Sequence, residues 1–300
     1  MRLGAHVSIS GSLDLAVDRA QALGCECLQI FYGSPRQWRL ISYSDEVIAR
    51  FAQKRRAAHL DPLVAHGAYL VNLATSNRKY RRRSVASLLA TARGVQRLAG
   101  LGVVTHLGSR LGAPRRQALQ RIAGAVREVL DGTEGVMVLL ENSAGSGSSL
   151  GASFEDFSDI IDLLKGDSRV GVCLDTAHLF AAGWDLRHRE GVDAMVEAFD
   201  HAAGWDRVRV LHLNDSKVPL GSHLDRHENI GEGHLGIDGF RAIVTHPLLR
   251  TLPGILETPG FDQKGPDRKN LARLNRLRGD RRLPAHRAAV RTAGRRRGLS

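Results

Sequence analysis

Two alternating patterns of apolar and polar positions run through most of the chain. Short apolar runs typical of buried β-strands alternate with longer stretches in which apolar residues recur at helical spacing. In residues 84–100, for example, apolar side chains recur at steps of three and four, and Gly100 stands where such a helix would end. The predicted strands are 3–8, 27–33, 62–70, 103–109, 136–143, 170–178, 208–216 and 254–260, and the clearest predicted helices are 12–24, 44–59, 84–100, 114–132 and 154–166.

Eight predicted strands that alternate with helices favour one architecture over its nearest rival. The repeat from Leu3 to Gly260 matches a (β/α)8 TIM barrel of the α/β class in both strand number and size. The alternative, an open doubly wound sheet, usually carries a Gly-x-Gly-x-x-Gly turn after its first strand, and residues 4–12 contain no such turn. We therefore predict a single barrel domain over residues 1–277, with a last helix near 267–277, followed by an arginine-rich, disordered tail over 278–300.

Net charge changes this picture only after its position is taken into account. The chain of 300 residues carries a formal charge of +12, which suggests a polyanionic partner such as nucleic acid. Residues 263–300 hold thirteen Lys or Arg and two Asp, so they contribute +11 and the rest of the chain +1. The basic end is either a DNA-binding tether or an inert, solvated extension.

Cysteine content and hydropathy indicate the compartment. Cys25, Cys27 and Cys173 cannot all pair, and a chain this long needs no disulfides to stabilise its core. The N-terminal residues lack the basic and apolar regions of a signal peptide, and no apolar run approaches the ~20 residues that span a bilayer. We therefore expect a cytoplasmic protein with reduced thiols and no membrane partner.

Ionisable side chains gather at the predicted strand ends, where (β/α)8 barrels carry their functional residues. Six of the strands, or the loops after them, supply His66, His106, Glu141, Asp175, His178, His212, Asp225, His227 and Glu257. A lone strand histidine is more often a hydrogen-bonded core residue than a ligand, and we assign that ordinary role to His6, His59, His188, His201, His223, His234, His246 and His286. Nine acids and imidazoles at one barrel end would leave several buried charges unpaired, a cost that bound divalent cations offset.

The donor atoms of these nine side chains narrow the choice of metal. All offer nitrogen or oxygen and none offers sulfur, which suits Zn²⁺, Mn²⁺ or Fe²⁺ rather than a structural thiolate zinc site. Nine donors exceed what one or two ions need, and three ions with a bridging carboxylate fit the number. Three divalent ions outweigh the four carboxylates in charge, so such a centre suits hydrolysis of a phosphate diester.

Six segments, taken in order along the chain, resemble the endonuclease IV family of type 2 AP endonucleases. They are residues 66–73 (HGAYLVNL), 141–151 (ENSAGSGSSLG), 175–185 (DTAHLFAAGWD), 212–217 (HLNDSK), 225–236 (DRHENIGEGHLG) and 256–259 (LETP). The resemblance extends from Leu3 to about residue 277 and implies a monomeric DNA-repair enzyme with three zinc ions. The implied reaction is hydrolysis of the phosphodiester 5′ to abasic sites in duplex DNA, which leaves 3′-hydroxyl and 5′-deoxyribose phosphate ends.

The resemblance also implies a role for individual side chains. By it, His66, His106 and Glu141 hold the first zinc, Glu141 bridges to a second held by Asp175, His212 and Glu257, and His178, Asp225 and His227 hold the third. It implies that Glu141 and Glu257 are the catalytic residues, with Glu257 orienting or deprotonating the hydroxide that attacks phosphorus. It assigns DNA contacts to Arg36, Gln37, Tyr69 and Leu70, which would fill the space left by an extruded nucleotide.

Three features depart from the family pattern, and two other functions stay open. Residues 105–109 read Thr-His-Leu-Gly-Ser where His-Pro-Gly-Ser is common, Ser34 replaces a larger polar residue, and the tail has no counterpart. A sugar isomerase or epimerase on a related barrel would need only one or two ions. A noncatalytic protein could instead bind nucleic acid through the basic tail.

Overall fold

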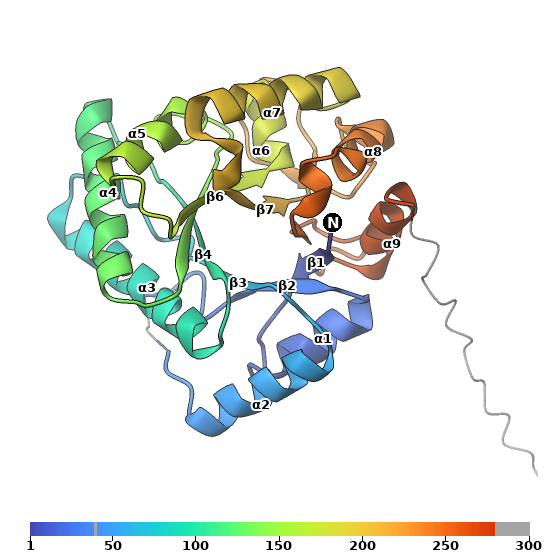
Figure 1. Cartoon of the computed structure of the whole chain (residues 1–300), viewed down its shortest axis with the longest axis horizontal. Coiled ribbons are helices and arrows are strands. Elements are labelled where there is room, and N and C mark those ends of the chain that lie inside the picture. The colour runs from blue at the N-terminus through green and yellow to red at the C-terminus, as the bar shows by residue number, and fades with distance from the viewer. Residues whose placement is uncertain (39–40, 280–300) are drawn as a thin grey trace, which may run out of the picture.

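The eight predicted strands close into a parallel barrel. A computed structural model describes residues 1–38 and 41–279 of the chain, and Figure 1 shows the barrel with helices around it. Neighbouring strands follow the order β1, β10, β7, β6, β5, β4, β3, β2, and β2 pairs with β1 to close the ring. The barrel strands are β1 (Leu3–His6), β2 (Cys27–Phe31), β3 (Leu63–His66), β4 (Gly102–His106), β5 (Met137–Glu141), β6 (Val170–Asp175), β7 (Val208–His212) and β10 (Gly254–Leu256). The predicted TIM-barrel fold is confirmed.

Helices cover the outside of the barrel and connect its strands (Figure 1). They are α1 (Leu15–Leu23), α2 (Asp45–Ala57), α3 (Arg78–Arg97), α4 (Arg115–Asp131), α5 (Glu155–Leu163), α6 (Thr176–Ala182), α7 (Arg189–Ala203), α8 (Gly236–Thr245) and α9 (Arg268–Leu277), with 3-10 turns η1 (Trp205–Arg207) and η2 (Leu249–Thr251). The helix α3 begins at Arg78 rather than at the predicted residue 84. The Asn77 side chain caps it, because it accepts a hydrogen bond of 3.0 Å from the backbone N–H of Tyr80.

Two predicted strands end earlier than the apolar pattern suggests. β6 ends at Asp175, whose side chain accepts a hydrogen bond of 2.9 Å from the backbone N–H of His178 and so caps α6. His178 therefore lies on the first turn of a helix, not in a strand. After β7 the chain leaves the barrel, and β8 (Asp215–Ser216) pairs antiparallel with β9 (His227–Glu228) in a separate two-stranded sheet.

A layer of apolar side chains fills the barrel interior. Its buried members are Cys27, Val64, Val104, Leu139, Cys173, Val210 and Ile255, one from each barrel strand except β1. β1 contributes Gly4, which is in register with Cys27 and Ile255. A Cβ at Gly4 would lie only 2.0 Å from the Cys27 carbonyl oxygen, so the barrel can close tightly only with glycine here. We call this set the apolar layer.

The thiols, the hydropathy of the helices and the C-terminal end agree with a reduced, compactly closed barrel. All three cysteines are buried and free, and burial raises the pKa of Cys25 and Cys173 to about 12. Within the described residues, no helix is both long and apolar enough to cross a membrane. Arg278 donates to Glu26 at 2.7 Å and to the Met1 carbonyl oxygen at 2.6 Å. The predicted disorder of the remaining tail falls on 280–300, which lie outside the described residues.

Two helical glycines provide a test of this packing. Gly94 in α3 faces the buried ring of Tyr32, and a Cβ there would lie 2.4 Å from the ring. A Cβ at Gly124 in α4 would meet its nearest neighbour, Arg81, at an ordinary 3.5 Å. Because alanine favours helix by about 1 kcal/mol over glycine and overpacking costs about 1–3 kcal/mol, we expect Gly94→Ala to destabilise the protein and Gly124→Ala to stabilise it. Urea denaturation measures both, and equal stability of the two variants would contradict the packing described.

Candidate metal centre

The barrel strands place a second layer of inward-facing side chains next to the apolar layer. Side chains two positions apart on a strand share a face, so each strand that contributes to the apolar layer presents another inward residue two positions later. These residues, which we call the polar layer, are His6, Gln29, His66, His106, Glu141, Asp175, His212 and Glu257. Six of the nine predicted site residues belong to the polar layer. The other three lie beside it: His178 on α6, Asp225 before β9, and His227 in β9.

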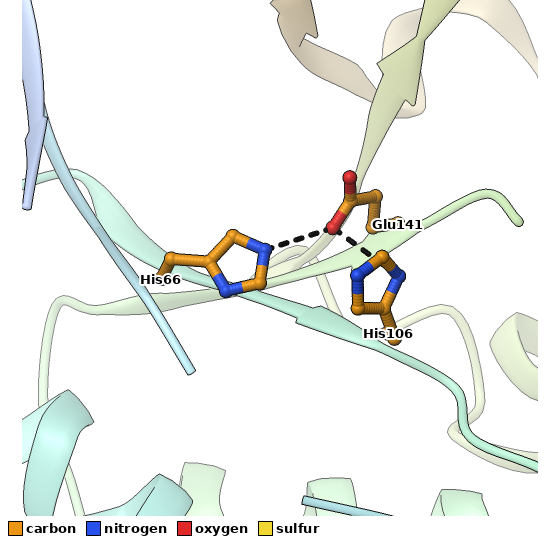
Figure 2. A group of neighbouring side chains, drawn as sticks. All are labelled: His66, His106 and Glu141. Carbon is orange, nitrogen blue, oxygen red and sulfur yellow. Dashed lines mark hydrogen bonds and ion pairs between the residues drawn. The ribbon is translucent and has the colours of Figure 1, made fainter. Parts of the chain in front are cut away.

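The first group of candidate ligands joins His66, His106 and Glu141 from the neighbouring strands β3, β4 and β5 (Figure 2). His66 Nε2 lies 3.0 Å from Glu141 Oε2, and His106 Nδ1 lies 3.4 Å from the same oxygen. The other nitrogen of His66, Nδ1, donates to the Gly67 carbonyl oxygen at 2.7 Å. In the neutral ring the lone pair of Nε2 then faces a carboxylate, an arrangement that a cation between them satisfies.

The second group shares Glu141 with the first and adds Asp175, His212 and Glu257. His212 Nδ1 lies 3.0 Å from Glu141 Oε1, 3.2 Å from Glu257 Oε2 and 3.9 Å from Asp175 Oδ2. Gln29 determines where the proton of this ring sits. Its Nε2 donates to Glu257 Oε1 at 2.6 Å, so its Oε1 accepts from His212 Nε2 at 2.9 Å. The Nδ1 lone pair of the neutral ring therefore faces three carboxylates, which again fits a bound cation.

The third group combines His178, Asp225 and His227, with Asp175 beside them. His178 Nδ1 donates to the Asn142 carbonyl oxygen at 3.0 Å, which leaves Nε2 3.2 Å from Asp225 Oδ2. His227 Nε2 lies 3.3 Å from Asp225 Oδ1 and 3.6 Å from Asp175 Oδ2. Both Nε2 atoms are buried, and neither has a hydrogen-bond partner among the described residues. Two unpartnered imidazole nitrogens that face one carboxylate fit a metal ion closely.

Electrostatic interactions within the cluster favour charged groups. Burial opposes ionisation of Glu141, but His106 and His212 outweigh it and hold the pKa of this carboxyl well below its usual range. Burial also lowers the pKa of His178, but Asp175 and Asp225 outweigh it and raise that pKa to about 10. Near pH 7 the metal-free cluster therefore combines carboxylates with protonated rings, and a metal ion would displace the ring protons.

His6 and Gln29 complete the polar layer, and the sequence analysis identified neither. His6 is not an ordinary structural histidine, because its Nδ1 lies 2.9 Å from Glu257 Oε1 and 3.0 Å from Gln29 Nε2. Burial opposes ionisation of Glu257, but His212 and His6 outweigh it and hold its pKa well below the usual range. A signal was available, since each missed residue follows the inward-facing residue of its strand, Gly4 or Cys27, by two positions.

Two buried asparagines that follow strand ends hold the second group in place. Asn142 Oδ1 accepts a hydrogen bond of 2.6 Å from the backbone N–H of Asp175. Asn214 Nδ2 donates to Asp175 Oδ2 at 2.7 Å, and its Oδ1 accepts from the backbone N–H of Glu257 at 2.9 Å. One amide thus fixes the relative positions of two candidate ligands on different strands.

Asp215 anchors the segment that follows the third group. This buried carboxylate accepts backbone hydrogen bonds from Gly231, Gly233 and Leu235 at 2.9, 3.1 and 2.9 Å. A Cβ at Gly233 would lie 2.5 Å from Asp215 Oδ1, so only glycine allows this close approach. Because β8, which contains Asp215, pairs with β9, the same anchor supports the strand that carries His227.

The four residues predicted to contact DNA lie on two adjoining segments. Tyr69 and Leu70 line a hollow of about 390 Å³ whose other walls include three candidate ligands. Tyr69 is 61% exposed and is therefore not a core residue. Its backbone N–H donates to the Pro35 carbonyl oxygen at 3.0 Å, which joins this segment to the loop that carries Arg36 and Gln37, both exposed.

Comparison with known proteins shows the family of the chain. Residues 17–277 match the family described as "Xylose isomerase-like TIM barrel". Over 93% of its length the chain is 42% identical to "Probable endonuclease 4" of Halothermothrix orenii, and the match covers 100% of that protein. It is 43% identical to "Probable endonuclease 4" of Methanoculleus marisnigri, over 92% of this chain and 99% of that protein.

Solved structures give the same result. The crystal structure of endonuclease IV from Thermus thermophilus superposes with a TM-score of 0.80 at 34% identity, covering 93% of this chain and 98% of that one. A D-tagatose 3-epimerase-like protein superposes with a TM-score of 0.68 at 19% identity over 92% of this chain and 97% of that one, a likeness of fold alone. Identity and coverage together show that the chain belongs to the endonuclease IV family.

Proposed function

We propose that the protein is a zinc-dependent AP endonuclease of DNA repair. It hydrolyses the phosphodiester 5′ to an abasic site in duplex DNA and leaves 3′-hydroxyl and 5′-deoxyribose phosphate ends. The observation that carries the proposal is the set of three overlapping ligand groups at one end of the barrel, in which unprotonated or unpartnered imidazole nitrogens face carboxylates. The family of the chain supports the same reaction.

The three groups divide the proposed ligands among three ions. His66, His106 and Glu141 hold the first ion, and Glu141 also reaches the second, which Asp175, His212 and Glu257 complete. His178, Asp225 and His227 hold the third. Zinc suits these nitrogen and oxygen donors, and manganese or iron(II) suits some of the positions. Bound divalent ions lower the pKa of water and stabilise negative charge on a phosphodiester.

The protein's own side chains orient the reaction. Glu257 is held at Oε1 by His6 and Gln29, which leaves Oε2 directed at His212 and the second group. Because its pKa is held low, Glu257 is ionised at neutral pH and can orient the attacking water and accept its proton. Glu141 serves as the shared carboxylate between two groups.

Recognition of the lesion is assigned to the exposed residues beside the cluster. Tyr69 and Leu70 line the hollow that opens onto the candidate ligands, and Arg36 and Gln37 lie on the adjoining loop. An exposed aromatic ring and a half-buried leucine suit insertion into the space that an extruded nucleotide leaves. The partner is therefore duplex DNA that contains an abasic site, bound by a monomer.

The sugar isomerase or epimerase alternative differs in the number of ions. Such a site needs only one or two ions, whereas the third group adds three donors that it would not use. The alternative predicts metal analysis near one ion per chain and no incision of DNA. The proposal predicts close to three ions per chain and incision of abasic duplex.

Metal removal and a matched pair of variants test the proposed chemistry. We expect chelator-treated protein to lose incision of abasic duplex DNA and to regain it with added zinc. We expect Glu257→Gln to lower the incision rate at least about 100-fold, the lower range for a positioned acid–base group. Glu190→Gln makes the same chemical change at an exposed position on α7 and should keep full activity. Full-rate incision by chelated protein or by Glu257→Gln would overturn the proposal.

Proton release provides a second test. His178 in the metal-free site has a pKa of about 10, so at pH 7 its ring is protonated and must lose that proton to bind zinc. Zinc binding should therefore release protons, and zinc affinity should rise with pH. Calorimetric titration in buffers of different ionisation enthalpy counts the protons. His178→Gln should release fewer protons, while His201→Gln, an exposed change on α7, should match the wild type. Affinity that falls as pH rises is incompatible with this assignment.

Deletion of residues 279–300 separates the barrel from the basic tail. We expect the shortened protein to bind DNA more weakly at low salt, because fewer phosphates are neutralised, yet to incise abasic duplex at a similar rate when DNA is saturating. Incision assays and binding at several salt concentrations measure the two effects. Complete loss of DNA function on deletion would instead favour the noncatalytic tail-binding alternative.

A further inference from the structure

A second hollow, distinct from the candidate metal centre, lies between the first turns of α3 and α4. It has a volume of about 630 Å³ and is lined by Arg78, Arg81, Arg82 and Arg121 together with the glutamines Gln117 and Gln120. Both helices follow barrel strands directly, so their N-terminal ends lie at the same end of the barrel as the candidate ligands. We call this feature the arginine hollow.

The charges of the arginine hollow are only partly compensated. Arg81 donates to Glu128 at 2.6 Å and Arg121 donates to the Ala74 carbonyl oxygen at 2.8 Å, so both guanidinium groups are held in place. Arg81 Nε and Arg121 Nη2 are nevertheless buried without an acceptor anywhere in the described part of the chain. A buried donor left unpaired costs about 1–3 kcal/mol, more when it belongs to a charged group. The hollow therefore offers fixed, unused donors to an anion.

Two further cations complete the rim of the hollow. Arg78 and Arg82 are exposed, and neither forms an ion pair with any described residue. No acidic side chain lines the hollow. The N-terminal ends of α3 and α4 add the positive ends of two helix dipoles. Planar guanidinium groups with several donors suit a phosphate group better than they suit a single carboxylate.

Tyr80 connects the arginine hollow to the candidate metal centre. It stands in α3 between Arg78 and Arg81, and its ring lines the 390 Å³ hollow that also contains Tyr69 and Leu70. Its hydroxyl donates to the Leu70 carbonyl oxygen at 2.8 Å. The arginine hollow and the proposed DNA-contact segment therefore adjoin the same residue, so a strand that leaves the metal centre on this side passes the arginines.

We propose that the arginine hollow binds a backbone phosphate of the duplex that flanks the abasic site, and so extends the DNA footprint outward from the metal centre. This inference rests on the proposed function, because it takes the polyanion to be DNA. The contact carries no sequence information and acts on any duplex long enough to reach it.

The test compares two double variants with equal loss of charge. Arg78→Gln with Arg82→Gln removes the free cations of the hollow. Arg56→Gln with Arg250→Gln removes two exposed arginines near the opposite end of the barrel, at the end of α2 and in η2. Full-length, metal-loaded protein is titrated with duplex that carries an abasic analogue and a non-hydrolysable linkage at the incision site, and with undamaged duplex, over a range of salt concentrations.

The proposal predicts a specific pattern. The slope of log affinity against log salt becomes shallower by about 0.9 for each phosphate lost in the hollow variant and stays unchanged in the control variant. The loss is equal on abasic and undamaged duplex, and shortening the duplex on one side of the lesion removes it. The incision rate at saturating DNA does not change, because the hollow lies outside the reacting groups.

Other outcomes overturn the inference or the proposed function separately. Equal salt slopes for the hollow and control variants overturn the inference, even if the wild type incises abasic duplex normally. Titration with inorganic phosphate that depends on Arg78 and Arg82, without any change in the DNA slope, would assign the hollow to a free anion and also overturn it. Failure of the wild type to incise abasic duplex removes the proposed function, while the undamaged-duplex titrations still decide the role of the hollow.

Discussion

The carboxylate of Glu141 is the group around which the rest of the candidate centre is built. It is 1% exposed, and its two oxygens face imidazole nitrogens on opposite sides, Oε2 toward His66 and His106 and Oε1 toward His212. A buried carboxylate of this kind is tolerated only while positive charge stays beside it. In the metal-free protein that charge is carried by protons on the rings, and in the proposed enzyme it is carried by metal ions, so the two compete for the same positions.

The residues that support this cluster are neutral amides, which fits the charge balance. Gln29, Asn142 and Asn214 each combine a donor and an acceptor in one rigid group. Asn142 and Asn214 both hold Asp175, while Gln29 holds His212 and Glu257. Each amide therefore aligns groups on different strands without adding a charge that bound metal would have to offset.

The sequence predicts the fold and nearly the whole candidate site, and the omissions have physical reasons. The alternation of apolar runs and helical stretches suffices for the barrel, and the nine predicted residues do lie together at its end. His6 was missed because it stands 251 positions from Glu257, and only closure of the ring brings them together. The start of α3 was missed because its first turns are polar and carry no apolar period, although Asn77 offered a cap. The arginines of that turn consequently drew no attention as a binding surface.

Closure of the ring has a consequence for the order in which the centre can form. His66, His106 and Glu141 lie on adjacent strands and can meet as soon as the first half of the barrel has assembled. Glu257 follows the last strand, and its contacts with His6 and Gln29 span the junction between the two ends of the sheet. A growing chain on the ribosome therefore holds an incomplete cluster until β10 docks. Because ligands that bind only the native state stabilise it, ions held across this junction would secure the last step of folding, and a chain truncated before β10 could be recognised by its inability to retain them.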